Sequence, residues 1–278
     1  MISIVMPVHN AGEYLNESIG SILNQTYKNF ELICIDDAST DFISKSLLHK
    51  YGKEDNRIRL FFLKKGIGAA EARNIGMRVS RGEYIIFLDA DDIFDNIMLE
   101  KMYKYAQKYN TDICVCGYRV YSDEEKKEIT SIYLPQKKDV TNREFLLSEM
   151  QEDGLMCLGL APWNKLCKRT FLLKKNIYFQ SLHSSNDVFF SCMCAILASR
   201  IVYCDGGVPL LSYRINNQNQ ISAKRNPLDY YQAISFLLKK RSGQMSRIEF
   251  RQISYLLLIE SIRELEMSND EQKKRKCY

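Results

Sequence analysis

The sequence predicts an α/β fold, with a mostly parallel β-sheet flanked by helices and a helical C-terminal extension. Across residues 2–116, apolar runs typical of strands alternate with amphipathic segments typical of helices. This alternation is characteristic of parallel sheets covered on both faces. Polar residues directly follow three of the apolar runs, as in sheets that bind ligands at their carboxyl edge. The 278 residues suffice for one large domain with an appended helical part.

The strands predicted in the first half are short runs rich in β-branched, aliphatic and aromatic residues. They lie at residues 2–6, 30–35, 58–63, 84–88 and 113–116. Between them, apolar side chains recur at helical spacing, which predicts helices at residues 10–25, 41–51, 69–79 and 98–109. Asn10 is expected to cap the first of these helices, and Ser39, Thr40 or Asp41 the second.

Beyond residue 116 the pattern changes to a mixture of hairpin and helices. A charged turn at residues 122–128 separates strand-like pieces and predicts a hairpin within residues 120–134. Residues 201–213 are strand-like around a Gly206-Gly207 turn, and helical patterns cover residues 142–150, 189–198, 229–240 and 248–266. No repeat or low-complexity linker interrupts the sequence, so we expect one compact unit and a helical extension.

Composition favours a cytosolic protein. Nine cysteines without a disulfide-like framework fit a reducing compartment. The C-x-C pairs at residues 114–116 and 192–194 are interpreted as packing rather than as zinc ligands. No apolar run approaches the about 18–20 residues that cross a bilayer. The first seven residues lack a basic region and a cleavage site, so no signal peptide is expected.

The net charge of +5 is concentrated near the C-terminus, because residues 239–278 hold ten Lys and Arg against six Asp and Glu. An amphipathic helix at residues 248–266 precedes a basic run at 273–276. Two interpretations stay open for this part. The helix packs on the domain or on a second copy of the chain, or the basic run contacts an anionic membrane surface. We favour packing for the helix and keep membrane contact as the alternative for the basic run.

The acidic cluster Asp89-Ala90-Asp91-Asp92 directly follows the apolar run 84–88. Carboxylates so close together repel one another unless a cation balances them. Oxygen ligands without nearby His or Cys favour magnesium or manganese over zinc, and such ions usually accompany a phosphate. The cluster therefore predicts an enzyme acting on a nucleotide-linked substrate.

Two further polar segments follow strands, at residues 7–10 and 36–37. Any one of the three alone could be a turn with helix-capping residues. Because the carboxyl ends of parallel strands meet at one edge of a sheet, the three together favour a binding site. The phosphate-loop motif and the three-glycine dinucleotide fingerprint are both absent from this sequence.

Nine segments, in this order and spacing, carry a family resemblance: residues 3–10 (SIVMPVHN), 21–27 (SILNQTY), 36–41 (DDASTD), 68–76 (GAAEARNIG), 82–84 (GEY), 87–92 (FLDADD), 163–166 (WNKL), 186–190 (NDVFF) and 213–216 (YRIN). They resemble glycosyltransferase family 2, of the bacterial surface-polysaccharide type, whose members have the Rossmann-like GT-A fold. The resemblance spans residues 2–225. It implies a catalytic domain at 1–225, with a nucleotide-binding half at 1–118 and an acceptor half at 119–225. Residues 226–278 would be the helical extension with its basic tail.

The resemblance also implies roles for single residues in binding the donor. Asp37 would accept the uracil imide N–H, and Pro7 and His9 would line the base pocket, although the family usually has a larger aromatic at the His9 position. Arg73 would lie near the base and the diphosphate. Asp91 would be the main ligand of Mn²⁺ or Mg²⁺, and Asp89 would assist near the ribose and the metal. Asp92 would instead cap the segment that follows.

On the acceptor side, Asp187 is the predicted general base. The family has an acidic pair here, whereas this chain has Asn186 followed by Asp187. Helix capping is the alternative role of Asp187. The single tryptophan, Trp163, would bind the acceptor or belong to the core. Arg214 would reach the diphosphate or form an ion pair.

These roles together imply an inverting, metal-dependent glycosyltransferase that moves a hexose-type sugar, with UDP as the expected carrier. The acceptor would be a glycan or a lipid-linked hydroxyl in capsular or other polysaccharide synthesis, and no nucleic-acid partner is expected. We expect a cytoplasmic location, with peripheral contact to the inner face of the membrane through the basic tail and homodimer contact through the C-terminal helices as open alternatives. The main competing interpretation is a non-catalytic sugar-binding or nucleotide-binding protein of the same fold. A sugar nucleotidyltransferase is a second, less favoured alternative.

Overall fold

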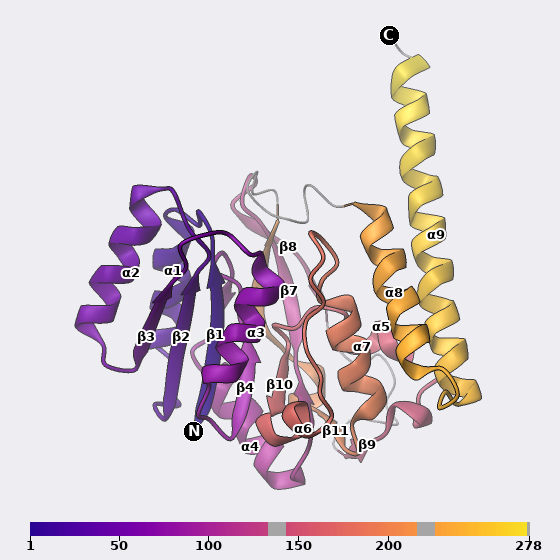
Figure 1. The fold of residues 1–278 in the computed structure, drawn as a ribbon, viewed down its shortest axis with the longest axis horizontal. Helices are drawn as coiled ribbons and strands as arrows, with labels where there is room; N and C mark the ends of the chain where they lie inside the picture. The colour runs from indigo at the N-terminus through magenta and orange to yellow at the C-terminus, as the bar shows by residue number, and fades with distance from the viewer. Residues whose placement is uncertain (133–142, 216–225, 277–278) are drawn as a thin grey trace.

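The computed structural model describes residues 1–132, 143–215 and 226–276, and the side chains of the last helix as far as Glu266. Within these residues, an eight-stranded sheet has the order β3-β2-β1-β4-β10-β6-β11-β9. Helices cover it on both sides (Figure 1). Its strands are β1 (Ile2–Val8), β2 (Phe30–Asp36), β3 (Ile58–Phe62), β4 (Tyr84–Phe87), β6 (Ile113–Val115), β9 (Glu144–Phe145), β10 (Lys165–Lys168) and β11 (Ile201–Tyr203).

The first half of the large sheet is parallel, as predicted. Strand β1 pairs in parallel with β2 and with β4, β2 pairs in parallel with β3, and β6 with β11. Strand β10 runs antiparallel to both of its neighbours, and the short edge strand β9 runs antiparallel to β11. The α/β fold with a mostly parallel sheet is therefore confirmed.

A second, four-stranded sheet has the order β5-β12-β7-β8. Its strands are β5 (Ile93–Phe94), β7 (Gly117–Ser122), β8 (Lys127–Ile132) and β12 (Pro209–Ile215). The antiparallel pair β7–β8 confirms the hairpin as far as residue 132; residues 133 and 134 lie outside the described part. The strand-like stretch 201–213 divides between β11 in one sheet and β12 in the other. The division occurs at a turn where Asp205, Gly206 and Gly207 have positive φ.

The helices of the first half agree closely with the sequence pattern. The described helices are α1 (Tyr14–Leu23), α2 (Phe42–Glu54), α3 (Ala69–Val79), α4 (Met98–Tyr109), α5 (Gly154–Leu158), α6 (Arg169–Lys174), α7 (Val188–Leu197), α8 (Pro227–Arg241) and α9 (Arg247–Lys276). Asp41 caps α2, because its Oδ2 accepts the backbone N–H of Ser44 at 2.8 Å.

Two local predictions are wrong. Asn10 does not cap α1, which begins at Tyr14; it has a φ of 52°, and its Oδ1 instead accepts the backbone N–H groups of Thr40 and Asp41. The helix predicted for 142–150 is wrong over the described residues 143–150, which form β9 and a short 3₁₀ turn. Its apolar Phe145 stacks on Tyr203 at 5.1 Å between ring centroids, so tertiary packing overrides the local pattern.

Alternate side chains of the central strands enter two hydrophobic cores, one on each face of the large sheet. On β1, Val5 belongs to one core, whereas Ile4 and Met6 belong to the other. This alternation follows from the two-residue period of a strand. Because both faces of the central strands are buried, their sequences are continuous apolar runs.

Helices α8 and α9 share the core that contains α7, through Ile234 and Leu237 on α8 and Ile253 and Leu256 on α9. The predicted division of the chain at residue 225 stays a prediction. Helix α9 extends past the rest of the ribbon toward the C-terminus (Figure 1). Among the described helices, none combines the length and the apolar character needed to span a membrane.

Candidate active site

The polar segments after β1, β2 and β4 meet at one edge of the large sheet. The parallel register places Val8 beside Asp36 and Val5 beside Phe87, so all three strands end at the same edge. The backbone N–H of Asp37 donates to the carbonyl of Val8 at 2.8 Å. The structure thus brings together the three segments that the sequence pattern assigned to one site.

Asp37 is buried and held by backbone amides. Its two carboxylate oxygens accept the N–H groups of Ile67 at 2.7 Å and Gly68 at 2.8 Å. Gly68 has a φ of 87°, a conformation that favours glycine. The exposed His9 donates from Nδ1 to the carbonyl of Asp37 at 2.7 Å, and Pro7 lies half-buried on β1. Sequence reasoning missed the amide contacts of Asp37, although glycines at 66 and 68 were a signal of close backbone approach.

Arg73 links the acidic loop to the start of α7. It is buried on α3, its Nη2 donates to Asp89 Oδ1 at 2.7 Å, and its Nη1 donates to Asn186 Oδ1 at 3.0 Å. The guanidinium also lies over the ring of Phe179, 5.3 Å from its centroid. The fixed fork of a guanidinium suits this double attachment. Three segments that are distant in the sequence are thereby joined at one residue.

The three carboxylates of the acidic loop lie in different environments. Asp89 and Asp91 are half-buried, whereas Asp92 is fully buried. Asp92 Oδ1 accepts the backbone N–H of Arg214 at 2.9 Å, and among the described residues its Oδ2 has no hydrogen-bond partner. Burial, and then the neighbouring Asp91 and Asp89, raise the pKa of Asp92 well above its usual range. Asp92 therefore attaches the loop to β12 rather than capping the segment that follows.

The donor set at this loop suits a hard divalent cation that is shared with a substrate. Asp91 and Asp89 offer carboxylate oxygens, and no group of three or more His, Cys, Asp or Glu ligands occurs in the described part of the chain. Magnesium is commonly bound by one or two carboxylates together with substrate phosphates, rather than by a complete protein cage. The residues present therefore fit a cation that needs a diphosphate to complete its coordination.

Asp187 occupies the N-cap position of α7, but its side chain makes no capping hydrogen bond. The carboxyl group is half-buried, and its burial is the largest influence on its pKa, which is raised. The negative charge of Asp89 also raises this pKa, whereas the positive charges of Arg73 and Lys165 lower it. A carboxylate with a raised pKa is a stronger base, which suits proton removal near neutral pH.

Trp163 lies mainly in the core, with an exposure of 6%. Its ring stacks on Tyr213 with centroids 5.5 Å apart and meets the edge of Tyr118 at 4.7 Å. The core interpretation therefore accounts for most of its surface, and an acceptor contact stays a prediction.

The neighbouring Lys165 is a buried cation that sequence reasoning missed. Its Nζ donates to backbone carbonyls in the turn after α5, with 2.7 Å to Gly159.

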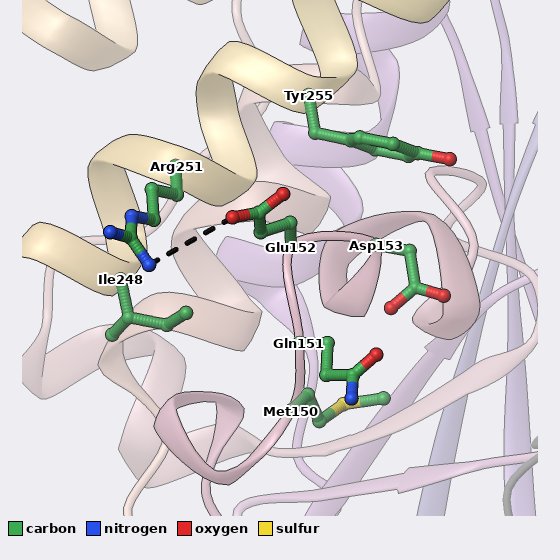
Figure 2. Close-up of a pocket in the computed structure, with 7 residues that line it drawn as sticks. All are labelled: Met150, Gln151, Glu152, Asp153, Ile248, Arg251 and Tyr255. Carbon is green, nitrogen blue, oxygen red and sulfur yellow. Dashed lines mark ion pairs between the residues drawn. The ribbon is translucent and has the colours of Figure 1, made fainter.

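A separate surface pocket of about 580 Å³ lies between residues 150–153 and the first turns of α9 (Figure 2). Its side chains include the ion pair of Arg251 with Glu152 at 3.9 Å, with the ring of Tyr255 alongside. It shares no lining residue with the edge that holds the acidic loop, so it is not part of the candidate active site.

A parallel sheet with aspartates and an arginine gathered at its carboxyl edge has the architecture of the GT-A transferases. The chain belongs to glycosyltransferase family 2, because the family model described as "Glycosyl transferase family 2" matches residues 3–171, more than half of its length. It is therefore a transferase that acts on sugars.

Individual relatives agree with this assignment. The chain is 32% identical over 259 residues to the glycosyltransferase GlyG of Streptococcus pneumoniae, covering 90% of this chain and 74% of GlyG. Its fold matches S. aureus TarS residues 1–349, crystallised with UDP-GlcNAc, at a TM-score of 0.75 and 20% identity over 91% of this chain and 70% of that one. It also matches the mannosyltransferase PcManGT of Pyrobaculum calidifontis, solved with GDP-Man and Mn²⁺, at a TM-score of 0.56 and 15% identity over 95% and 80%.

Proposed function

We propose that the protein is an inverting, metal-dependent enzyme that moves a hexose-type sugar from a nucleotide sugar to an acceptor hydroxyl during polysaccharide or other glycan synthesis. The observation that carries the proposal is the contact of Arg73 with both Asp89 and Asn186. This contact connects the acidic loop, whose carboxylates suit a cation, with the end of α7 that carries Asp187. A cation site and a base in one network are what transfer from a diphosphate leaving group requires.

UDP is the carrier that the base-side residues support. Asp37 is aligned by two backbone amides and retains lone pairs that can accept the imide N–H of uracil. The neighbouring His9 is exposed beside it, with a ring that can stack on a base. The TarS structure named above contains UDP-GlcNAc, whereas that of PcManGT contains GDP-Man. A thermal-shift screen across UDP-, GDP- and dTDP-sugars with Mn²⁺ discriminates between these carriers.

The chain's own residues divide the remaining work. Asp91 and Asp89 would hold Mn²⁺ or Mg²⁺, which when bound neutralises the charge that develops on the leaving diphosphate. Arg73 orients Asp89. Asp187 accepts the proton of the acceptor hydroxyl as that oxygen attacks the anomeric carbon from the face opposite the nucleotide. The bond between the anomeric carbon and the diphosphate oxygen breaks in the same step, and the nucleoside diphosphate leaves with the bonding electrons. The positive charges of Arg73 and Lys165 favour the ionised form of Asp187 before the proton arrives.

The experiment that tests the proposal is Asp187→Asn. Transfer should fall by at least about 100-fold, within the usual contribution of a general base, while UDP binding measured by calorimetry should stay within about twofold. Asp205→Asn is a matched control, because this exposed carboxylate pairs with Lys101 on the surface. Full transfer activity in Asp187→Asn would contradict the assignment. Nucleotide binding without any transfer in the wild type would favour the non-catalytic alternative, and nucleotide–sugar bond formation would favour a nucleotidyltransferase.

We further propose a cytoplasmic location, with a glycan or lipid-linked acceptor. The eight cysteines of the described residues are all free thiols, which supports a reducing compartment. Peripheral membrane contact through residues 273–276 and pairing of two copies through α8 and α9 stay predictions. The basic run has no described side chains, and α8 and α9 already share the core of the domain.

A further inference from the structure

Arg214, near the end of β12, is a charged residue with an exposure of only 3%. Its three guanidinium nitrogens donate to three different segments. Nε donates to the backbone carbonyl of Asp91 at 2.8 Å, Nη1 to Asp123 Oδ1 at 2.6 Å, and Nη2 to Glu17 Oε2 at 2.6 Å. One side chain therefore connects the acidic loop, the turn after β7 and helix α1.

Two aromatic rings enclose the same guanidinium. It lies 4.8 Å from the ring centroid of Tyr14 and 5.5 Å from that of Tyr121. The hydroxyl of Tyr14 donates to Asp123 Oδ2 at 2.8 Å, which ties α1 to the turn a second time. Two carboxylates and two ring faces balance the charge of Arg214. Its donors are thus committed to the protein, which favours the ion-pair alternative over the contact with the diphosphate.

The backbone of Arg214 makes a further contact to the acidic loop, through its N–H to Asp92 Oδ1 at 2.9 Å. This bond continues the pairing of β12 with β5, in which Ser212 lies beside Ile93. Two consecutive residues of the loop are therefore attached to a single residue of β12. The side chain of Arg214 holds Asp91, and its main chain holds Asp92.

We propose that Arg214 is a positioning residue that sets the direction of the Asp91 carboxylate for the divalent cation. A peptide group is planar, so fixing the carbonyl of Asp91 restricts the backbone from which its carboxylate projects. The geometry also requires arginine, because a lysine ammonium lacks the rigid fork that reaches three acceptors at once. The inference rests on the proposed function, since Asp91 is the cation ligand only there.

The test compares Arg214→Met and Arg214→Lys with the matched control Arg119→Met. Arg119 is also an ion-paired arginine of the small sheet, with contacts to Asp95, to Ser212 Oγ at 3.3 Å and to the Pro209 carbonyl at 3.2 Å. The measurement is Mn²⁺ affinity in the presence of UDP, by calorimetry, together with unfolding in urea. Both Arg214 variants should bind Mn²⁺ at least tenfold more weakly, whereas Arg119→Met should stay within twofold despite its own loss of stability.

Wild-type Mn²⁺ affinity in Arg214→Met would overturn the inference, as would equal weakening in Arg119→Met, because the effect would then reflect general loss of stability. Should Arg214→Met not fold, Arg214→Lys keeps the positive charge and carries the comparison. Asp91→Asn separates the two proposals. If Asp91→Asn weakens Mn²⁺ binding and the Arg214 variants do not, only the positioning role is wrong. If Asp91→Asn has no effect, the cation site itself is wrong.

Discussion

Buried thiols should make the protein lose stability at alkaline pH. Cys34 on β2 and Cys192 on α7 are fully buried, and burial raises the pKa of each thiol to about 12. In the unfolded chain a cysteine has a pKa of about 8.5. The folded state therefore keeps protons that the unfolded state releases. The stabilisation from each thiol is complete below about pH 8.5 and is lost as the pH rises toward 12.

The magnitude follows from linkage between proton binding and folding. At pH 10 the folded thiol is still protonated and the unfolded thiol is almost fully ionised. Because pH 10 lies about 1.5 pH units above the unfolded pKa, ionisation of the unfolded chain lowers the free energy of unfolding by about 2 kcal/mol per cysteine. Together, Cys34 and Cys192 should account for about 4 kcal/mol. That is a large share of the about 5–15 kcal/mol that stabilises a typical domain.

The assay is urea unfolding at pH 7 and pH 10 under reducing conditions, for the wild type, Cys34→Ala and Cys192→Ala. The packing lost on truncation is the same at both pH values, so pH 7 serves as the control for each variant. Each variant should lose about 2 kcal/mol less than the wild type between pH 7 and pH 10. A pH-dependent loss as large in Cys34→Ala as in the wild type would refute the assignment of that loss to a buried thiol.

Two further predictions concern packing and catalysis. Gly76→Ala should destabilise the fold by about 1–3 kcal/mol in urea, because an added Cβ would lie 2.3 Å from Val5 Cγ1. The control Gly20→Ala, where the added Cβ meets nothing within 4 Å, should raise stability by up to about 1 kcal/mol. Asn186→Asp should shift the acid limb of the kcat/KM profile to higher pH, because a second carboxylate raises the pKa of Asp187 and the base must be ionised. An unmoved acid limb would argue against Asp187 as the base.

The regular parts of the fold could be predicted because their signals are local. Helices α3 and α4 match the predicted bounds, 69–79 and 98–109, since their apolar positions repeat at helical spacing. Residues 143–150 could not be predicted in this way. Phe145, Leu147 and Met150 are buried in the core from an edge strand and a single turn. The pairing partner of β9 is β11, far along the chain. Asn10 shows the same limit, because its side chain bonds residues 30 and 31 positions away.

The site was partly predictable for a related reason. Asp37, Asp89 and Asp91 follow strands, so topology alone assigns them to one edge of the sheet. The role of Lys165 and the partners of Arg214 could not be predicted from spacing. Glu17, one partner of Arg214, lies 197 residues away in the sequence. Only the folded chain shows that the guanidinium of Arg214 is buried.

The contacts of Arg73 explain how the site accommodates Asn186 in place of the first acidic residue of the family's pair. Arg73 carries one positive charge and pairs with the carboxylate of Asp89 at 2.7 Å. Its other Nη group meets the neutral amide oxygen of Asn186. A carboxylate at position 186 would pair with the guanidinium of Arg73 as well, and it would place a second negative charge beside Asp187. With an amide there, the charge of Arg73 still lowers the pKa of Asp187 against the larger effect of burial. The base is therefore kept within reach of ionisation by a residue that itself carries no charge.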